Sequence, residues 1–366
     1  MAFKSLRVLH VETGRHLYGG AYQVLLLLRG LASLGMENIL CAPPESAIAR
    51  AAGPYATVVP LKITGELDPR LPWILWTALD RWRPHLVHAH SRRGADWWAG
   101  LVARRRRIPS VVTRRVDNPE NAALARLKYG FYGRIIAISE AIARILRGQR
   151  VRAEKIRIVK SCIEPERFGN PYPREKVLRD FGLSQNSTLI GTVAQLIARK
   201  GHARLIDVAP DVTARYPAAH FCFFGQGPLM KALRRRAQFR KVFEHVHFLG
   251  FREDMDRIFP CLDLLVHPAT MEGLGVCLLE AAAASVPIVA GRAGGIPEIV
   301  HHGINGLLID PANERELLSA ILWMLQSPEE ARRMGTAGRH LVKAKFSLQA
   351  MVQGNVAVYR EILETS

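Results

Sequence analysis

Short apolar runs alternate with longer segments of helical periodicity along the whole chain. Six such runs, rich in Val, Ile and Leu, predict β-strands in the first part of the chain, at residues 6–11, 38–41, 57–61, 85–90, 110–113 and 134–138. Six more follow at residues 189–193, 220–224, 245–249, 262–266, 287–290 and 306–308. Strands that alternate with helices favour a parallel sheet covered by helices, so the pattern predicts an α/β fold.

A stretch rich in proline and glycine separates the two series of strands. Residues 162–173 contain Pro165, Gly169, Pro171 and Pro173, a composition typical of a linker. We therefore expect two doubly wound domains in tandem, residues 1–170 and 171–346, with a cleft between them. The last helical pattern, at residues 348–363, follows the second domain, and residues 347–366 are expected to pack back on the first domain.

The composition is that of an ordinary globular protein with two hydrophobic cores. The chain has 366 residues, of which 49% are apolar and 23% charged, so it is too hydrophobic for a disordered protein. Its five cysteines form no Cys-x-x-Cys pair, which excludes a disulfide scaffold and indicates reduced thiols. Charged residues interrupt the N-terminal apolar segment, and no stretch approaches the roughly 18 apolar residues of a membrane span. We expect a cytoplasmic protein.

Positive charge is concentrated in the first half of the chain. Lys and Arg outnumber Asp and Glu by 51 to 32, which gives a formal net charge of +19. Up to Asn170 the counts are 28 and 13, a net charge of +15, and beyond it they are 23 and 19, a net charge of +4. We therefore expect an anionic partner. Phospholipid is favoured over nucleic acid, because zinc-finger spacings, basic-zipper heptads and RNA-recognition aromatics are absent from the sequence.

Two basic segments contain aromatic residues and are candidates for contact with a membrane or an acceptor. They are residues 70–83, with three tryptophans among arginines, and residues 123–134. Packing against the sheet is the more ordinary explanation for the first of them.

Glycines and cations follow several of the predicted strands. The motifs are Gly19-Gly20, Arg199-Lys200-Gly201 and Gly225-Gln226-Gly227. Free N–H groups at a helix start favour anions, and the two cations of the second motif would add to this attraction at a diphosphate. Each motif taken alone is about as typical of a plain turn.

A pair of glutamates frames a glycine-rich helix start after the strand at 262–266. Glu272 precedes Gly273-Leu274-Gly275, and Glu280 lies a turn or more into the predicted helix. One carboxylate can thus meet a sugar and the other a ribose. A carboxylate buried on so apolar a helix is costly without a partner, which favours a functional role for Glu280 over a structural one.

The Glu272 to Glu280 segment resembles the E-x7-E motif of the retaining glycosyltransferases of family 4, which have the GT-B fold. Further motifs follow in the order seen in that family: Gly19-Gly20, Ser139, Lys200-Gly201, Gly225-x-Gly227, Gly294-Gly295-x-Pro297-Glu298 and Gly303-x-Asn305-Gly306. The resemblance spans nearly the whole chain. It implies two Rossmann-like domains, of which the N-terminal one faces the acceptor and the C-terminal one binds a nucleotide-sugar donor.

The resemblance also implies roles for single residues. Glu280 would bind the ribose hydroxyls of the donor, Glu272 its sugar, and Lys200 its diphosphate; Glu272, Lys200 and His90 form the expected catalytic set. The expected donor-binding residues are Gly19, Gly20, Arg199, Lys200, Gly201, Gly227, Glu272, Gly273, Leu274, Gly275 and Glu280. Neither a metal nor a cofactor is expected, because protein cations can stabilise the leaving diphosphate and the sequence lacks a clear Asp-x-Asp motif.

Two positions depart from the family's pattern. Gln195 stands where many members have an arginine, and Arg199 would compensate. A first-domain strand ends in Thr113-Arg114-Arg115 where the family often has a histidine, and an arginine stays protonated and cannot act as a general base. His88 and His90 are the alternative candidates for this role, although a histidine such as His88 more often lies in the core. We expect His88, Arg114 and Arg115 on the acceptor side.

These features predict a retaining transfer of a sugar from a nucleotide-sugar to a glycan or lipid-linked acceptor, as in lipopolysaccharide or cell-envelope polysaccharide synthesis. We also expect peripheral contact with the anionic inner face of the cytoplasmic membrane. Two alternatives are an epimerase of the same fold and a nonenzymatic protein that binds an anionic polymer and has a degenerate donor site. Gln195 and the missing histidine favour the last alternative, whereas Glu272 and Glu280 oppose it.

Overall fold

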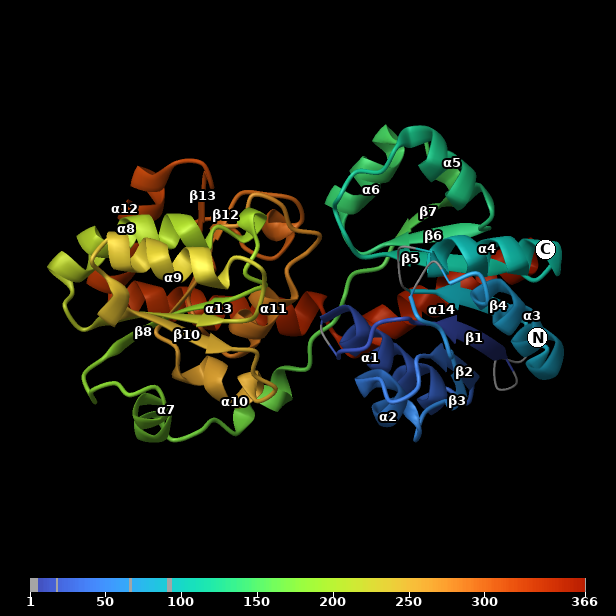
Figure 1. The fold of residues 1–366 in the computed structure, drawn as a ribbon, viewed down its shortest axis with the longest axis horizontal. Helices are drawn as coiled ribbons and strands as arrows, with labels where there is room; N and C mark the ends of the chain where they lie inside the picture. Colours follow the sequence, from blue (N-terminus) through green and yellow to red (C-terminus); the bar gives the residue numbers. More distant parts are fainter. Residues whose placement is uncertain (1–5, 18, 66–67, 91–93, 366) are drawn as a thin grey trace. The chain divides into compact units, whose positions relative to one another are not determined.

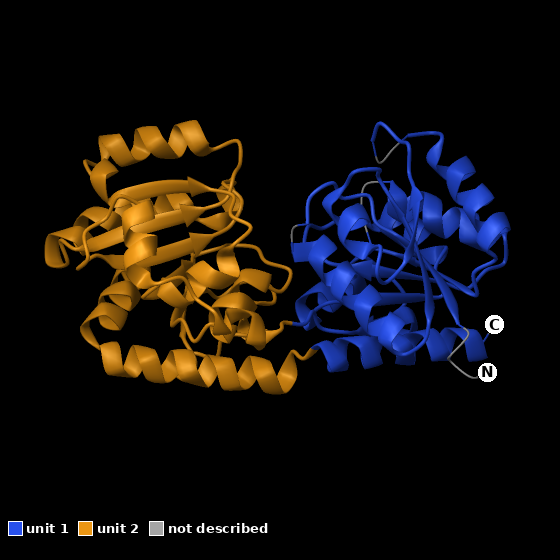
Figure 2. Cartoon of the chain, turned by 90° about the horizontal axis from the view of Figure 1, so that it is seen from below, with its two compact units in different colours: residues 1–162, 348–366 blue, residues 163–347 orange. Residues whose placement is uncertain are grey.

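The computed structural model of the chain describes residues 6–17, 19–65, 68–90 and 94–365 (Figure 1). It contains two compact units, coloured separately in Figure 2. Unit 1 comprises Met1–Cys162 and Leu348–Ser366, and unit 2 comprises Ile163–Ser347. The boundary between the units therefore precedes Asn170, the end of the first domain expected from the sequence.

Unit 1 is built on a seven-stranded parallel sheet with the strand order β3-β2-β1-β4-β5-β6-β7. Its strands are β1 (Arg7–Val11), β2 (Glu37–Ala42), β3 (Thr57–Pro60), β4 (Leu86–Ala89), β5 (Ser110–Arg114), β6 (Arg134–Ala137) and β7 (Ile156–Ile158). Its helices are α1 (Gly19–Ser33), α2 (Ala47–Ala52), α3 (Leu71–Trp82), α4 (Ala95–Arg105), α5 (Ala122–Gly130), α6 (Glu140–Gly148) and α14 (Leu348–Glu364).

Unit 2 has a six-stranded parallel sheet with the order β10-β9-β8-β11-β12-β13. Its strands are β8 (Thr188–Val193), β9 (Ala219–Phe224), β10 (Val246–Gly250), β11 (Leu264–His267), β12 (Ile288–Gly291) and β13 (Leu307–Ile309). Its helices are α7 (Arg174–Asp180), α8 (His202–Arg215), α9 (Met230–Phe239), α10 (Met255–Ile258), α11 (Val276–Ala283), α12 (Glu314–Gln326) and α13 (Pro328–Lys345).

The predicted α/β fold with two doubly wound sheets is confirmed. Each predicted strand is present, and the central strands are almost entirely buried because helices cover both of their faces. In both sheets the strand order reverses direction once, between β1 and β4 in unit 1 and between β8 and β11 in unit 2. At such switch points the loops that leave the carboxyl ends of the strands diverge and make room for a ligand.

The last helix, α14, completes the core of unit 1. It packs against α1, where Gly30 lets it come close: a Cβ atom on Gly30 would lie 2.2 Å from Cγ2 of Val352. Buried Met351 and Val352 join the same apolar cluster as Leu27 and Leu31 of α1. Unit 1 is therefore assembled from both ends of the chain.

The remaining features agree with a protein of reduced thiols. None of the five cysteines forms a disulfide, and four of them are buried. Among the described residues, no helix is long and apolar enough to cross a bilayer.

Candidate functional site

In unit 2, two loops meet at the switch point between β8 and β11. After β8 the chain forms a 3-10 turn, Ala198–Lys200, and Gly201 then begins α8. The carbonyl of Arg199 accepts a hydrogen bond of 2.9 Å from the backbone N–H of Thr270, which lies in the loop after β11. Gly201 has φ +79°, and a Cβ atom there would lie 2.4 Å from the carbonyl oxygen of Pro268. Only glycine allows this close approach, so steric packing explains why a glycine follows Lys200.

The two loops bring Lys200 and Glu272 together. Lys200 is only 8% exposed, and its Nζ donates to Oε2 of Glu272. Nε2 of His267, the last residue of β11, lies 2.9 Å from the same oxygen, and Nδ1 of His267 lies 3.8 Å from Sγ of Cys277. His267 is fully buried. Glu272 is thus bound both by Lys200 from the loop after β8 and by His267 at the end of β11.

The electrostatics of this group fix its protonation. Burial alone raises the pKa of Glu272, but the hydrogen bond and charge of His267, with the charge of Lys200, outweigh it and lower that pKa to about 2. Burial likewise lowers the pKa of His267, but Cys277 and Glu272 raise it to about 9. At neutral pH a carboxylate therefore lies between two cations. An incoming anion, such as a diphosphate, can compete with Glu272 for Lys200.

Glu280 lies in the middle of α11, which begins directly after Gly273, Leu274 and Gly275. Its carboxyl group is partly buried and has no side-chain hydrogen bond or ion pair within the described part of the chain. Burial raises the pKa of Glu280 to about 7. A carboxyl group in this state is available to hydrogen bond a hydroxyl-bearing ligand.

Two glycine motifs support the loops of the site. The N–H of Gly295 donates to the carbonyl of Glu272 at 2.9 Å, and a Cβ atom on Gly294 would lie 1.9 Å from that carbonyl oxygen. After β9, Gly227 packs in the same way on the loop after β8, where a Cβ atom would lie 2.5 Å from the carbonyl oxygen of Leu196. Gln195 is exposed in that loop.

In unit 1, the expected residues gather at the switch point between β1 and β4. Gly19 and Gly20 begin α1, and a Cβ atom on Gly20 would lie 3.6 Å from Cδ of Arg115. Nε of Arg115 is buried and has no hydrogen-bond partner within the described residues. Burial lowers the pKa of Arg115 to about 10. Gly19 and Gly20, expected to bind the donor, thus belong to the same unit as the acceptor-side residues.

Arg114 is buried and anchors the loop after β5. Its Nε donates to the carbonyl of Val116 at 2.8 Å and its Nη1 to Oε1 of Glu120 at 2.8 Å. These contacts occupy its guanidinium within its own loop. Arg115, by contrast, offers an unsatisfied donor at the switch point.

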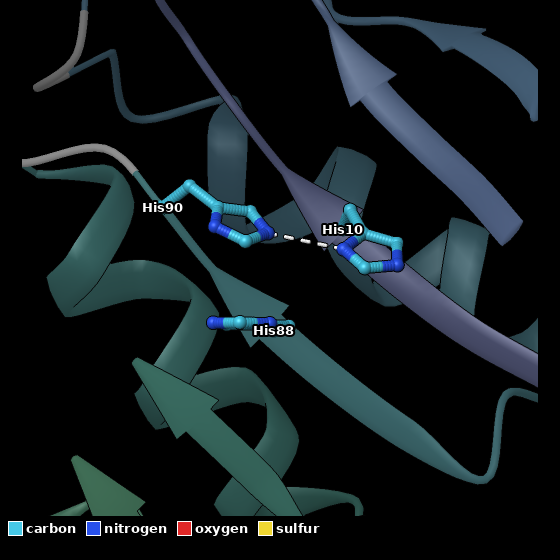
Figure 3. A group of neighbouring side chains, drawn as sticks. All are labelled: His10, His88 and His90. Atoms are coloured by element: carbon cyan, nitrogen blue, oxygen red, sulfur yellow. Dashed lines mark hydrogen bonds between the residues drawn. The ribbon is translucent and has the colours of Figure 1, made fainter. Parts of the chain in front are cut away.

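Three histidines form a buried cluster in unit 1, shown in Figure 3. Nδ1 of His10 lies 3.0 Å from Nε2 of His90, and Nε2 of His10 lies 3.3 Å from Oδ1 of Asn38. The ring centroids of His88 and His90 are 3.9 Å apart. Burial lowers the pKa of all three rings, to about 3 for His10, so they are neutral at physiological pH.

Neutral imidazoles are good metal ligands, and one nitrogen of each ring lies within 4.8 Å of the others. The cluster as it stands is instead committed to hydrogen bonds, since both nitrogens of His88 are engaged. Nδ1 lies 2.6 Å from Oη of Tyr359 and Nε2 lies 2.7 Å from Oγ1 of Thr113. Nδ1 of His90 is buried without a hydrogen-bond partner among the described residues.

Sequence reasoning missed His267 and His10. His267 ends an apolar strand and has the pattern of a core residue, although it lies five positions before Glu272 at the same sheet edge. His10 lies on β1, and the parallel register pairs it with His88 on β4. Recognition that β1 and β4 are neighbours would have brought these histidines together.

Two family models together match most of the chain. Residues 18–167 match the model "Glycosyltransferase Family 4", and residues 173–341 match the model "Glycosyl transferases group 1". These matches divide the chain between the two sheets described above.

Two curated relatives are similar to this chain in sequence. A GDP-mannose-dependent alpha-(1-6)-phosphatidylinositol monomannoside mannosyltransferase of Mycolicibacterium smegmatis is 33% identical over 188 residues, 49% of this chain and 49% of the relative. The alpha-maltose-1-phosphate synthase of the same organism is 25% identical over 76% of this chain and 73% of the relative. The chain thus matches the mannosyltransferase over about half of the relative's length.

Solved structures share the fold over the full length. A glycosyltransferase from Rickettsia africae has a TM-score of 0.86 at 18% identity and covers 99% of this chain and 100% of its own. Anabaena Alr3699/HepE, solved in complex with UDP and glucose, has a TM-score of 0.84 at 20% identity and covers 97% of this chain and 99% of its own. The matches along both halves identify the chain as a glycosyltransferase of the family 4 type, and the solved structures show that it shares their two-sheet GT-B fold.

Proposed function

We propose that the protein transfers a sugar from a nucleotide-sugar donor to a glycan or glycolipid acceptor of the cell envelope, with retention at the anomeric carbon and without a metal. Peripheral contact of unit 1 with an anionic membrane is part of this proposal. The main support is the geometry in unit 2, where Lys200, Glu272 and His267 meet at the switch point and Glu280 follows on α11.

The chemistry follows from these positions. Lys200 would leave Glu272 for the diphosphate and stabilise the charge that develops on the leaving group. Glu272, released but still bound to His267, would accept a hydrogen bond from the donor sugar. Glu280 would accept hydrogen bonds from the ribose, which explains a partly buried carboxyl group with no partner among the described residues.

Retention requires the acceptor hydroxyl to attack on the face from which the nucleotide leaves. A phosphate oxygen of the leaving group would take the proton of that hydroxyl in place of an enzymatic base, and the new glycosidic bond would form as the bond to the nucleotide breaks, without an enzymatic nucleophile. The rate enhancement would come from positioning and from the cations Lys200 and Arg199. His90 would act through Nδ1, which has no hydrogen-bond partner among the described residues, since its Nε2 is bound to His10.

The substrates of the relatives support the substrate class. The Mycolicibacterium relative uses GDP-mannose and acts on a phosphatidylinositol mannoside, and the Anabaena structure holds UDP and glucose. A glycolipid acceptor also fits the positive charge of the first half of the chain.

Thermal unfolding in the presence of UDP, GDP, ADP and their common sugars tests the donor site. A ligand that binds only the folded protein raises the midpoint of unfolding, and we expect one nucleotide-sugar to do so selectively. Glu280→Gln should weaken this ligand by about tenfold, because the amide removes one of the two acceptor oxygens for the ribose. Glu314→Gln, on the exposed start of α12, serves as the matched control.

Turnover of the selected donor with a lipid-linked acceptor in the presence of EDTA, followed by NMR of the anomeric proton, tests the mechanism. An inverted product, or activity that EDTA abolishes, would contradict the retaining, metal-independent reaction. Absence of any stabilising nucleotide-sugar would contradict the donor site itself.

A further inference from the structure

A basic pocket lies in unit 1 at the amino-terminal edge of the sheet. It is formed where α4 and α5 end and where the chain turns from α6 into β7, and it has a volume of about 300 Å³. Five cationic side chains line it, together with Tyr129, Gly130 and Val151: Arg104, Arg126, Arg150, Arg152 and Lys155. The expected ligand edge of a parallel sheet is the opposite, carboxyl edge, so this pocket is separate from both switch-point sites.

Three basic segments that are far apart in the sequence converge here. Arg104 belongs to the run 104–107, Arg126 lies on α5, and Arg150, Arg152 and Lys155 lie in the turn before β7. A solvated helix surface would explain each run alone. Their meeting in one concave site is a feature of the fold.

Among the residues that the structure describes, the five pocket cations form no salt bridge. A buried lysine of the same unit is paired: Lys128 lies 2.7 Å from Asp96 and 2.8 Å from Glu120. Within the described ranges, by contrast, no carboxylate lies at ion-pair distance from any of the five pocket cations. Burial lowers the pKa of Lys155, and the charges of Arg152 and Arg104 lower it further, while the charge of Glu154 offsets only part of this shift. Positive charge is thus crowded together.

Helix ends explain only part of this arrangement. Carbonyl groups at a helix C-terminus attract cations, and Nζ of Lys155 donates to the carbonyl of Tyr132 at 2.6 Å, just after α5. Arg104 reaches the carbonyl of Gly130 at 3.5 Å. The side chains of Arg126, Arg150 and Arg152 have no such hydrogen bond in the part of the chain that the structure describes.

We infer that this pocket binds a phosphate group carried by a larger molecule. Guanidinium groups match phosphate oxygens in pairs, and a phosphate monoester or diphosphate brings the multiple negative charge that several unpaired cations favour. The volume exceeds the need of a bare ion and leaves room for the group that carries the phosphate. The site is independent of the proposed sugar transfer, because it needs none of the residues in unit 2.

The phosphate could belong to a lipid headgroup or to a soluble molecule. Exposed apolar side chains on the same helix as Arg126 favour a lipid, since Leu124 and Leu127 of α5 are each 55% exposed. Apolar side chains next to basic ones suit the boundary between headgroups and acyl chains.

Binding of inorganic pyrophosphate, measured by calorimetry at low salt, tests the pocket. All proteins carry Lys200→Ala, so that the candidate donor site does not contribute. The pocket variant Arg126→Gln/Arg150→Gln/Arg152→Gln is compared with Arg105→Gln/Arg107→Gln/Arg144→Gln, which removes the same charge from exposed positions of the same unit outside the pocket. We expect the pocket variant to lose at least about tenfold in affinity and the control less than about twofold. Equal losses in both variants would overturn the inference.

Vesicles of phosphatidylcholine with and without phosphatidic acid distinguish the two sources. For a lipid headgroup, the protein should sediment with phosphatidic acid vesicles, the pocket variant should not, and Leu124→Gln/Leu127→Gln should weaken sedimentation while it leaves pyrophosphate binding unchanged. For a soluble ligand, the pocket variant and the charge-matched control should sediment alike, although only the pocket variant loses pyrophosphate.

Discussion

The carboxylate of Glu272 is already bound to two cations before any substrate arrives. Lys200 was identifiable from the motif, because a lysine before a glycine at a helix start is typical of phosphate binding. His267 was not, since its apolar neighbours Val266 and Leu265 gave it the pattern of the core. Its contact with Glu272 follows only from the loop that turns back over the end of β11. Sequence thus predicts residues that obey a motif and misses residues that support them.

The charge of His267 predicts a specific pH dependence of stability. Its pKa in the folded protein is about 9, above the ordinary 6.5. Its contribution to stability is therefore fully present below pH 6.5 and is lost as the pH rises through 9, an effect on the order of 3 kcal/mol. Thermal unfolding of His267→Gln should accordingly differ most from that of the parent protein near pH 6, and the difference should shrink toward pH 9.5. The exposed His340→Gln is the control. A difference that is constant with pH would mean that His267 is neutral beside Glu272.

At the scale of elements, the loops at the switch point of unit 2 are held by glycines more than by side chains. The alternation of strands and helices was sufficient to predict the strands of both sheets except β7, whose three residues include only one that is buried. A short edge strand leaves little periodicity to detect. The loop contacts could not be predicted, because they join segments about 20 to 70 residues apart through backbone atoms that any sequence contains.

Gly294 provides a direct test of the loop packing. It has φ +52°, and a Cβ atom there would collide with the carbonyl of Glu272, whereas Gly303 has φ +78° and would meet nothing within 4 Å. Gly303→Ala should therefore lose only the about 1 to 3 kcal/mol of backbone strain, and Gly294→Ala should lose more and also displace Glu272. Thermal unfolding and nucleotide-sugar affinity measure the two effects. Equal behaviour of the variants in both assays would show that the loop yields without cost to the site.

At the scale of the whole molecule, two separate segments of the chain form unit 1. The last helical pattern was expected to return to the first domain, and α14 lies against α1 in unit 1. Where the chain leaves the unit, Gln23 of α1 makes two hydrogen bonds of 2.8 Å to the backbone of Cys162. Tyr359 of α14 reaches His88, so the helix also supports the histidine cluster. Stability of unit 1 therefore depends on a helix that is separated in the sequence from the rest of that unit by the whole of unit 2.

Two neighbouring substitutions on α14 test whether the stability of unit 1 depends on the packing of this helix or responds to any added charge. Val352 is 5% exposed and packs on Gly30, whereas Gln353 is exposed. Val352→Asp buries an unpaired carboxylate and should destabilise unit 1 by about 3 kcal/mol or more, while Gln353→Asp should change its stability by less than about 0.5 kcal/mol. Because two units need not unfold together, amide hydrogen exchange is the suitable measurement. Val352→Asp should raise exchange in β1 and β4 and leave β8 and β11 protected. If both sheets lost protection equally, unit 2 would depend on α14 as well, and the two units would unfold as one.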